Sequence, residues 1–301
     1  MNRMVATQEG LVRKGIDGFY YVETQNGVLE CRARGIFRRI GVTPLAGDHV
    51  KVCVSPGGTG SLEEILPRRN FLVRPPVANI DRLVIVVSTC EPSPNSLLID
   101  RTIVGAEAAG IEPILVISKI DLRRPDALSD VYSGAGIRVI CVSSPRGEGT
   151  GELKKLLPGK ITAFTGNTGV GKSTLLNSMF SGLDLPTGEI SRKLGRGRHT
   201  TRQVELLKLS DGGYVVDTPG FSSLDTQFSG VVTPEKLPLC FREFRPYLGR
   251  CRFSSCSHTC EAGCAIVEAV REGKISRRRH ESYVEIYREM KERKPWQKKS
   301  V

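Results

Sequence analysis

The chain has 301 residues, which suits about two domains, and 39% of them are hydrophobic, enough to fill ordinary globular cores. Its net charge of +12 favours an anionic partner such as nucleic acid. Residues 1–14 lack the apolar core of a signal peptide and no apolar run approaches 18 residues, so we expect neither a targeting segment nor a membrane partner.

Residues 1–70 alternate short β-rich runs with glycines and predict a small barrel. Five candidate strands span 11–14, 19–23, 28–33, 48–54 and 60–66. That many short strands in about 70 residues are typical of an OB-fold. Such a barrel commonly binds nucleic acid, and four arginines could line its binding face: Arg32, Arg34, Arg38 and Arg39. Arginines that are simply solvated are the alternative.

Residues 67–76 are rich in proline and predict an extended linker. Beyond Ala78 the pattern becomes α/β, with a helical stretch over 97–109. Apolar runs of the parallel-sheet type predict strands at 83–87, 114–117, 139–142, 161–165, 204–209 and 214–216. Strands that alternate with helices predict a doubly wound, mostly parallel sheet.

From about residue 222 the strand pattern stops. Helical pieces, a Cys/His cluster and a charged helix over 276–291 predict a third, mainly helical unit. We therefore expect three domains: a barrel over 1–70, an α/β domain over 71–222 and a metal-binding domain over 223–301. The run Arg277-Arg278-Arg279-His280 could lie against RNA phosphate, or it could be a solvated helix face.

The stretch Ser118-Lys119-Ile120-Asp121 follows a buried strand and predicts a loop that selects a nucleotide base. The Asp121 carboxylate offers two acceptors to the two adjacent donors of guanine, and adenine lacks that pair. The stem of Lys119 would lie over the base plane. GTPases normally carry Asn where this chain has Ser118, so guanine selection through Asp121 is expected and the effect of Ser118 on affinity stays open. Ser143, in the loop after the next strand, is expected to join this site.

A second stretch matches G-x-x-x-x-G-K-[ST], the P-loop, between a β-branched strand and a helix start. Its glycines let backbone N–H groups point at an anion, and the helix N-terminus adds its positive dipole end. We expect Lys172 to reach the β- and γ-phosphates and Ser173 to ligate Mg²⁺. The predicted nucleotide-binding residues are Gly166, Asn167, Thr168, Gly169, Val170, Gly171, Lys172, Ser173 and Thr174.

The stretch Asp217-Thr218-Pro219-Gly220 ends an apolar strand. In a P-loop fold an Asp at this place holds the Mg²⁺ shell, and the Gly220 N–H can sense the γ-phosphate. A plain Pro-Gly turn is the alternative. The base-selecting loop precedes the P-loop in this chain, whereas ordinary GTPases have the P-loop first. The order therefore predicts a circularly permuted domain, because surface loops tolerate new chain ends.

The spacing Cys251-x4-Cys256-x-His258-x5-Cys264 predicts a metal site. Cysteines crowded in this way indicate a metal in a reducing cytosol rather than a disulfide framework. Three thiolates and one imidazole give a closed tetrahedral site for one structural Zn²⁺. Cys260 could replace a neighbouring ligand.

With these motifs in this order, the chain resembles the circularly permuted, ribosome-small-subunit-dependent GTPases of bacteria (RsgA type) over essentially its whole length. Matching stretches are 67–69, 74–76, 195–201 and 217–221. The resemblance implies a GTPase that hydrolyses GTP to GDP, is stimulated by the 30S subunit, and acts in its late maturation by binding 16S rRNA. It implies Mg²⁺ with GTP and zinc on Cys251, Cys256, His258 and Cys264, which makes Cys260 the spare thiol.

The resemblance also implies that residues 195–201 are switch I. Thr201 would complete the Mg²⁺ shell, with Thr200 as the alternative. Phe221 stands where Ras-like proteins have a water-orienting Gln, and a Phe cannot polarise water. His199 is therefore the candidate catalytic residue, because its pKa suits proton handling. A surface His that contacts rRNA phosphate is the alternative.

The first functional hypothesis is accordingly a GTPase that couples its nucleotide state to its grip on the 30S particle. The alternative is an RNA-binding assembly factor in which nucleotide only tunes affinity and hydrolysis is incidental. A P-loop ATPase or kinase is a third possibility. We expect a cytoplasmic monomer.

Overall fold

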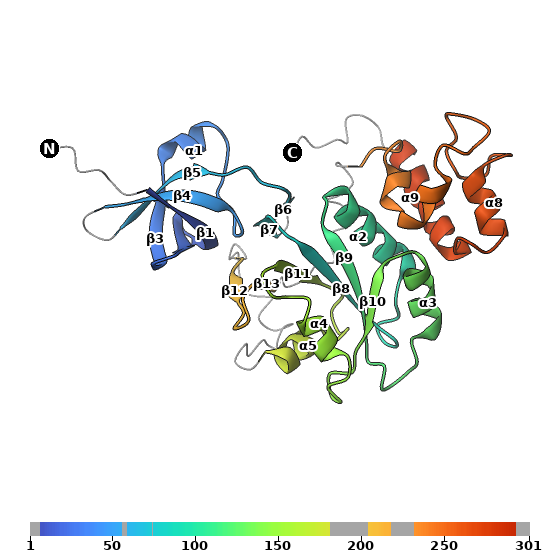
Figure 1. The fold of residues 1–301 in the computed structure, drawn as a ribbon, viewed down its shortest axis with the longest axis horizontal. Coiled ribbons are helices and arrows are strands. Elements are labelled where there is room, and N and C mark those ends of the chain that lie inside the picture. Colours follow the sequence, from blue (N-terminus) through green and yellow to red (C-terminus); the bar gives the residue numbers. More distant parts are fainter. Residues whose placement is uncertain (1–6, 56–58, 74, 181–203, 218–231, 293–301) are drawn as a thin grey trace. The chain divides into compact units, whose positions relative to one another are not determined.

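The structure is a computed structural model that describes residues 7–55, 59–73, 75–180, 204–217 and 232–292 (Figure 1). Its contacts divide the chain into two compact units. One holds residues 1–82, 157–164 and 193–219, and the other holds 83–156, 165–192 and 220–301. None of the described helices is long and apolar enough to cross a membrane.

The N-terminal strands form the closed barrel that the sequence predicts. They are β1 (Thr7–Ile16), β2 (Phe19–Thr24), β3 (Gly27–Ala33), β4 (His49–Val54) and β5 (Gly60–Ile65), in the order β1-β2-β3-β5-β4. β3 and β5 are parallel and the other pairs are antiparallel. Because alternate side chains of a strand point inward, Val12, Val22, Val50, Val52 and Leu62 meet in a buried core. The short helix α1 (Gly35–Arg39) follows β3 and buries Phe37 against that core.

The stretch predicted as a linker is folded. β6 (Phe71–Val73) and β7 (Pro76–Ala78) form an antiparallel hairpin. The guanidinium of Arg68 binds both carboxylate oxygens of Asp48, at 2.7 and 2.8 Å, and Asp48 is completely buried. Arg69 Nη1 donates to Asp81 Oδ1 at 3.0 Å. The Arg68 pair holds the segment against the barrel, and the Arg69 pair ties it to the residue before β8. The expectation of an extended linker, which rested on proline content, is therefore wrong.

The sheet is doubly wound and mostly parallel, as predicted. Its described strands are β8 (Arg82–Ser88), β9 (Glu112–Ser118), β10 (Arg138–Cys141), β11 (Ile161–Thr165), β12 (Leu206–Lys208) and β13 (Tyr214–Asp217), in the order β10-β9-β8-β11-β13-β12. β12 runs antiparallel to β13, and β11 runs parallel to it. The accompanying helices are α2 (Ser96–Ala108), α3 (Asp126–Gly134), α4 (Thr150–Lys154) and α5 (Lys172–Met179).

A bulge in β1 directs one barrel side chain toward β12. The register of β1 against β2 shifts between Val12 and Lys14, and such a bulge re-aims the residue that it carries, here Arg13. Arg13 Nε donates to the Leu206 carbonyl oxygen at 2.7 Å, and its Nη1 donates to Glu23 at 2.7 Å. Lys208 pairs with the same Glu23 carboxylate. The barrel and β12 are therefore joined by charged hydrogen bonds.

The C-terminal part is helical, as predicted. It contains the 3-10 turns η2 (Leu237–Cys240) and η3 (Arg242–Tyr247) and the helices α8 (Ala265–Arg271) and α9 (Arg277–Glu292). Phe241, Phe244 and Tyr283 form an aromatic core, with ring centroids 5.0 to 5.3 Å apart. Val104 of α2 packs into that core, and α9 lies beside α2 (Figure 1).

Candidate functional site

The predicted P-loop lies where β11 turns into α5. Gly171 has φ +91° and serves as the N-cap of α5, so Lys172 and Ser173 open the helix. A side chain on Gly166 would place its Cβ 2.5 Å from the Val86 carbonyl oxygen, which leaves room for glycine only. Asn167, Thr168 and Gly169 are exposed. An exposed glycine turn at a helix N-terminus is the geometry that binds phosphate through backbone N–H groups.

The predicted base-selecting loop follows β9. Ser143 Oγ donates to Asp121 Oδ1 at 2.7 Å, so the two residues that the sequence assigned to one site are in contact. This hydrogen bond lowers the pKa of Asp121, and the carboxylate is ionised at neutral pH. Lys119 has φ +61°, and its Nζ donates to the Glu91 carbonyl oxygen at 2.6 Å. The loop thus presents an acceptor carboxylate that a buried hydroxyl holds in position.

Ser118 points into the protein. Its side chain is 3% exposed, and Oγ lies 2.9 Å from the Val87 carbonyl oxygen and 2.5 Å from that of Val170. Since one hydroxyl carries one proton, these two acceptors share it. The contact ties the end of β9 to β8 and to the P-loop. Sequence reasoning treated Ser118 as a nucleotide ligand and missed this bracing contact, because Val170 is 52 residues away.

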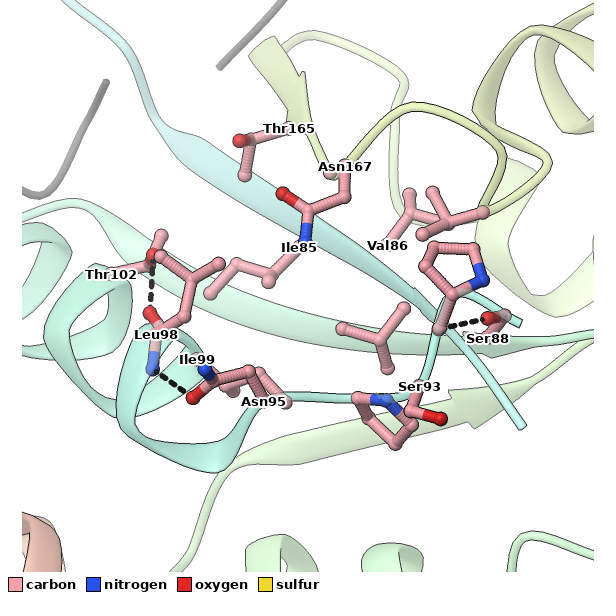
Figure 2. Close-up of a pocket in the computed structure, with 15 residues that line it drawn as sticks. Ile85, Val86, Ser88, Ser93, Asn95, Leu98, Ile99, Thr102, Thr165 and Asn167 are labelled. Carbon is pink, nitrogen blue, oxygen red and sulfur yellow. Dashed lines mark hydrogen bonds between the residues drawn. The ribbon is translucent and has the colours of Figure 1, made fainter. Parts of the chain in front are cut away.

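A pocket opens beside the start of the P-loop (Figure 2). Its walls come from the end of β8, the 92–95 turn, the first turns of α2 and residues 165–167. Ser88 Oγ lies 2.8 Å from the carbonyl oxygens of Cys90 and Pro92, and Asn95 Oδ1 caps α2 by accepting from Leu98 N. The hydroxyl and the cap order the 89–95 turn, whose Glu91 receives the Lys119 contact. No local sequence pattern indicates this pocket.

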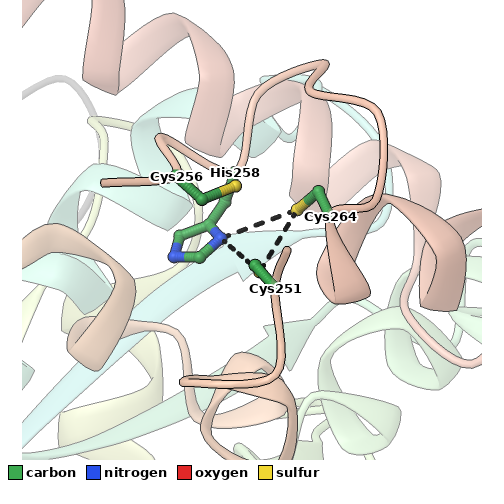
Figure 3. Close-up of side chains that lie close together, drawn as sticks. All are labelled: Cys251, Cys256, His258 and Cys264. Carbon is green, nitrogen blue, oxygen red and sulfur yellow. Dashed lines mark hydrogen bonds between the residues drawn. The ribbon is translucent and has the colours of Figure 1, made fainter. Parts of the chain in front are cut away.

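The four predicted metal ligands converge (Figure 3). The ligand atoms of Cys251, Cys256, His258 and Cys264 all lie within 4.8 Å of one another. His258 Nδ1 is 3.5 Å from Cys251 Sγ and 3.6 Å from Cys264 Sγ, and those sulfurs are 3.9 Å apart. A tetrahedral ion with metal–sulfur bonds of about 2.3 Å sets its sulfurs about 3.8 Å apart. The donor set therefore fits zinc, whereas Cys260 is exposed and outside the cluster.

Burial acts on the protonation of the cluster. It raises the pKa of the Cys256 thiol to about 12 and lowers that of His258. A neutral imidazole is the form that binds a metal, and a bound cation would deprotonate the thiols.

The loop that carries these ligands is braced by an acid that the sequence analysis did not single out. The Glu261 carboxylate accepts from the backbone N–H of Ser257, Thr259 and Cys260 at 2.7, 3.0 and 3.1 Å. Burial works to raise the pKa of Glu261, but the Ser257 hydroxyl and the backbone N–H groups of Glu261, Ser257 and Cys260 bring it down to about 2. From α9, Tyr283 donates to the Ser257 carbonyl oxygen at 2.7 Å.

The basic run at the start of α9 is only partly a surface feature. Arg277 and Arg278 are exposed, but Arg279 is completely buried. Its Nη1 donates to Asp100 Oδ1 at 2.5 Å and its Nε donates to Glu243 Oε1 at 2.8 Å. Contact of the whole run with RNA, one of the two sequence predictions, is therefore wrong for Arg279, which joins α9 to α2.

The remaining predicted site residues are at the edge of the described chain or beyond it. Asp217 ends β13, and its backbone is in register with Phe164, two residues before Gly166. The catalytic candidate His199, the magnesium candidates Thr200 and Thr201, and Gly220 and Phe221 lie outside the described residues.

Two family models match the sequence: RsgA GTPase over residues 65–227 and RsgA N-terminal domain over residues 9–62. The small ribosomal subunit biogenesis GTPase RsgA of Caldanaerobacter subterraneus subsp. tengcongensis is 48% identical, over 95% of this chain and 96% of that relative. Its counterpart in Moorella thermoacetica is 44% identical, over 94% and 97%.

Two solved structures share the fold. YjeQ from Thermotoga maritima is 36% identical and superposes with a TM-score of 0.83, covering 96% of this chain and 100% of that one. YloQ, described as a circularly permuted GTPase, is 35% identical with a TM-score of 0.81, covering 98% and 99%. At this coverage the likeness includes the barrel, the sheet and the helical C-terminal part.

Proposed function

The chain belongs to the RsgA family of GTPases, and from that membership we propose which of its residues perform each part of the reaction. The protein is a GTP-hydrolysing enzyme that acts in maturation of the small ribosomal subunit, with that subunit and GTP or GDP as its partners. The observation that carries the residue assignments is the Ser118 hydroxyl, which links the base-selecting strand to the P-loop. Two loops braced against each other support a single nucleotide site.

The P-loop holds the phosphates in this proposal. The backbone N–H groups of residues 166–171 surround the phosphate oxygens, and the positive end of α5 adds to their attraction. Lys172 reaches the β- and γ-phosphates, and Thr174 follows in the first turn of α5. The conformations of Gly169 and Gly171, with φ +88° and +91°, support this assignment.

The base is selected at the other loop. Asp121 accepts from the two adjacent donors of guanine, Lys119 covers the base plane, and Ser143 keeps the carboxylate ionised and oriented. Membership in a GTPase family removes the ATPase and kinase alternatives.

The family indicates Mg²⁺, which prefers oxygen donors such as hydroxyls and carboxylates. Ser173 lies in the first turn of α5. Asp217 ends β13, and its backbone is the register partner of Phe164 on β11, the strand that leads into the P-loop. We assign Ser173, Thr201 and Asp217 as its ligands. An ion held there together with GTP would neutralise charge on the phosphates. The Gly220 N–H would sense the γ-phosphate.

His199 is the proposed proton-handling residue, because Phe221 replaces the Gln that orients water in Ras-like proteins. The test is GTP turnover with and without 30S subunits. We expect stimulation of the wild type. His199→Ala should keep its GTP affinity and lose stimulated turnover by roughly 100-fold or more, the usual contribution of a general acid or base.

His49→Ala on β4 is the matched control and should keep full stimulation. Normal stimulation of His199→Ala would refute the catalytic role. Equal turnover with and without subunits in the wild type would favour the alternative, an RNA-binding assembly factor in which hydrolysis is incidental.

The Cys/His cluster is proposed to bind one structural zinc ion. Three thiolates and an imidazole fill a tetrahedral shell and leave no open position for a substrate. The role of the ion is therefore to hold the 251–264 loop against α9.

We keep the domain boundaries 1–70, 71–222 and 223–301 as a proposal. The barrel is proposed to contact 16S rRNA, since four of its arginines are exposed: Arg32, Arg34, Arg38 and Arg39. We propose a monomer, and a cytoplasmic location because the small ribosomal subunit is assembled there.

A further inference from the structure

A groove runs along the barrel beside α1. Its walls are the β1–β2 turn, the start of β2, the end of β3, α1 and the loop after it. We propose that this groove binds one unpaired RNA nucleotide, with its base stacked on the Arg32–Phe19 pair and its phosphate on the neighbouring arginines. The inference rests on the proposed rRNA binding of the barrel and specifies what that barrel recognises.

The stacking platform is built by the sheet. Phe19 and Arg32 are direct cross-strand partners of β2 and β3. The Arg32 guanidinium lies 4.6 Å from the centroid of the Phe19 ring, and Arg32 is exposed. A guanidinium held over a ring is a flat, weakly hydrated surface, and a nucleobase can stack on it. Fixing that surface in advance lowers the entropic cost of binding a base.

The groove is lined by three arginines and one acid, Asp17, so its charge is mainly positive. Arg32, Arg34 and Arg38 line it. Arg34 pairs with Glu63 at 2.5 Å, and within the part of the chain that the structure describes neither Arg32 nor Arg38 forms an ion pair with a carboxylate. Planar guanidinium groups can bind a phosphate through two hydrogen bonds, which a lysine cannot do. The groove therefore offers phosphate contacts next to the stacking surface.

The groove differs from a simply solvated basic surface because apolar side chains line it together with the arginines. Its lining includes Phe37, which is mostly buried, and the aliphatic Val42 and Pro44, with Val42 still 36% exposed. Phosphates of a duplex need only charges on an open surface. A splayed nucleotide also presents the face of its base, and a hollow with arginine, aromatic and aliphatic walls matches both parts.

The test compares two conservative variants of the full-length protein. Arg32→Lys keeps the charge and removes the planar stacking group, while Arg39→Lys makes the same change on α1 outside the groove lining. The probes are a short single-stranded RNA that carries 2-aminopurine, whose fluorescence falls on stacking, and a hairpin duplex of equal charge.

We expect Arg32→Lys to lower affinity for the single strand by roughly tenfold and to abolish the fluorescence change, with the salt slope unchanged. Arg39→Lys should stay within about twofold of the wild type. Basal GTP turnover, which does not involve Arg32, reports that each variant is folded. Phe19→Leu provides a second variant and should repeat the loss.

Equal affinity of Arg32→Lys and wild type for the single strand, or equal losses for single strand and duplex, would overturn the nucleotide pocket. These measurements need no ribosome. A wild type that 30S subunits fail to stimulate would therefore refute the proposed function separately.

Discussion

Asp121 is the residue on which the choice of base depends in our proposal. Asp121→Asn exchanges one acceptor oxygen for a donor that faces the donors of guanine. Loss of a charged hydrogen bond costs about 1.5–3 kcal/mol, so we expect GTP affinity to fall roughly 10- to 100-fold while weak ATP binding is unchanged. Titration with fluorescent nucleotides measures both. Asp130→Asn, on an exposed site of α3, is the control, and equal GTP affinity of the two variants would exclude Asp121 from the base site.

The Ser143 hydroxyl shifts the pH at which the base-selecting loop loses affinity for GTP, because it contacts the titrating Asp121 carboxylate. Its hydroxyl lowers the pKa of Asp121, so the acceptor carboxylate of the wild type persists to lower pH than an ordinary Asp. Ser143→Ala lets that pKa rise toward its usual value. Affinity for GTP, which is present above the pKa and lost below it, should then start to fall at a higher pH.

GTP titrations between pH 4 and 7 check the shift of this acid limb. Ser144→Ala alters the neighbouring hydroxyl and should follow the wild-type profile. Superimposable profiles for all three proteins would show that Ser143 does not control Asp121.

At the scale of elements, the 251–264 loop has little apolar material of its own and depends on the Cys/His cluster. Cys256→Ser should lose the metal and destabilise the C-terminal part by several kcal/mol, since metal binding is also folding free energy in such sites. Cys260→Ser should keep one zinc ion per chain, because Cys260 lies outside the cluster. Metal analysis and thermal unfolding measure these effects, and loss of zinc from Cys260→Ser would contradict the ligand assignment.

Elements with strong local patterns were predictable from the sequence. The strands of the sheet are continuous apolar runs, because parallel strands are buried on both faces. The turn from β11 to α5 is encoded by glycines whose backbone conformations other residues disfavour. The metal ligands lie within 14 residues of one another, so their spacing alone indicates a common ion.

Elements that depend on distant partners were not predictable. The segment that leads into the β6–β7 hairpin is tied to the barrel by the Arg68–Asp48 pair, 20 residues apart, and proline content carries no information on that contact. The strand expected over 204–209 is shorter than predicted. It covers Leu206–Lys208, the residues that pair with β13 in antiparallel fashion. Arg279 looked like part of a solvated run, since no local pattern shows that carboxylates from residues 100 and 243 converge on it.

At the scale of the whole molecule, the ion pair between Arg279 of α9 and Asp100 of α2 joins the C-terminal part to α2. Arg279→Met keeps the length of the side chain but leaves Asp100 and Glu243 buried without a counter-ion. Breaking a buried pair in this way costs about 3–5 kcal/mol, whereas the exposed Arg278→Met should change stability by less than about 0.5 kcal/mol. Urea unfolding measures both.

Adding Asp100→Asn to Arg279→Met removes one of the stranded charges and should recover part of the loss. Equal stabilities of Arg278→Met and Arg279→Met would show that the buried cluster contributes nothing.

The Asp100–Arg279 ion pair also determines when α2 can complete its packing during synthesis. Asp100 and Arg279 are 179 residues apart, and a ribosome that adds 5–20 residues per second needs roughly 10 to 35 s to cover that distance. Throughout this interval the nascent α2 carries a carboxylate that has no counter-ion to be buried with. The final packing of α2 must therefore wait until α9 has emerged, and until then the nascent chain exposes the surface of α2 that α9 will cover.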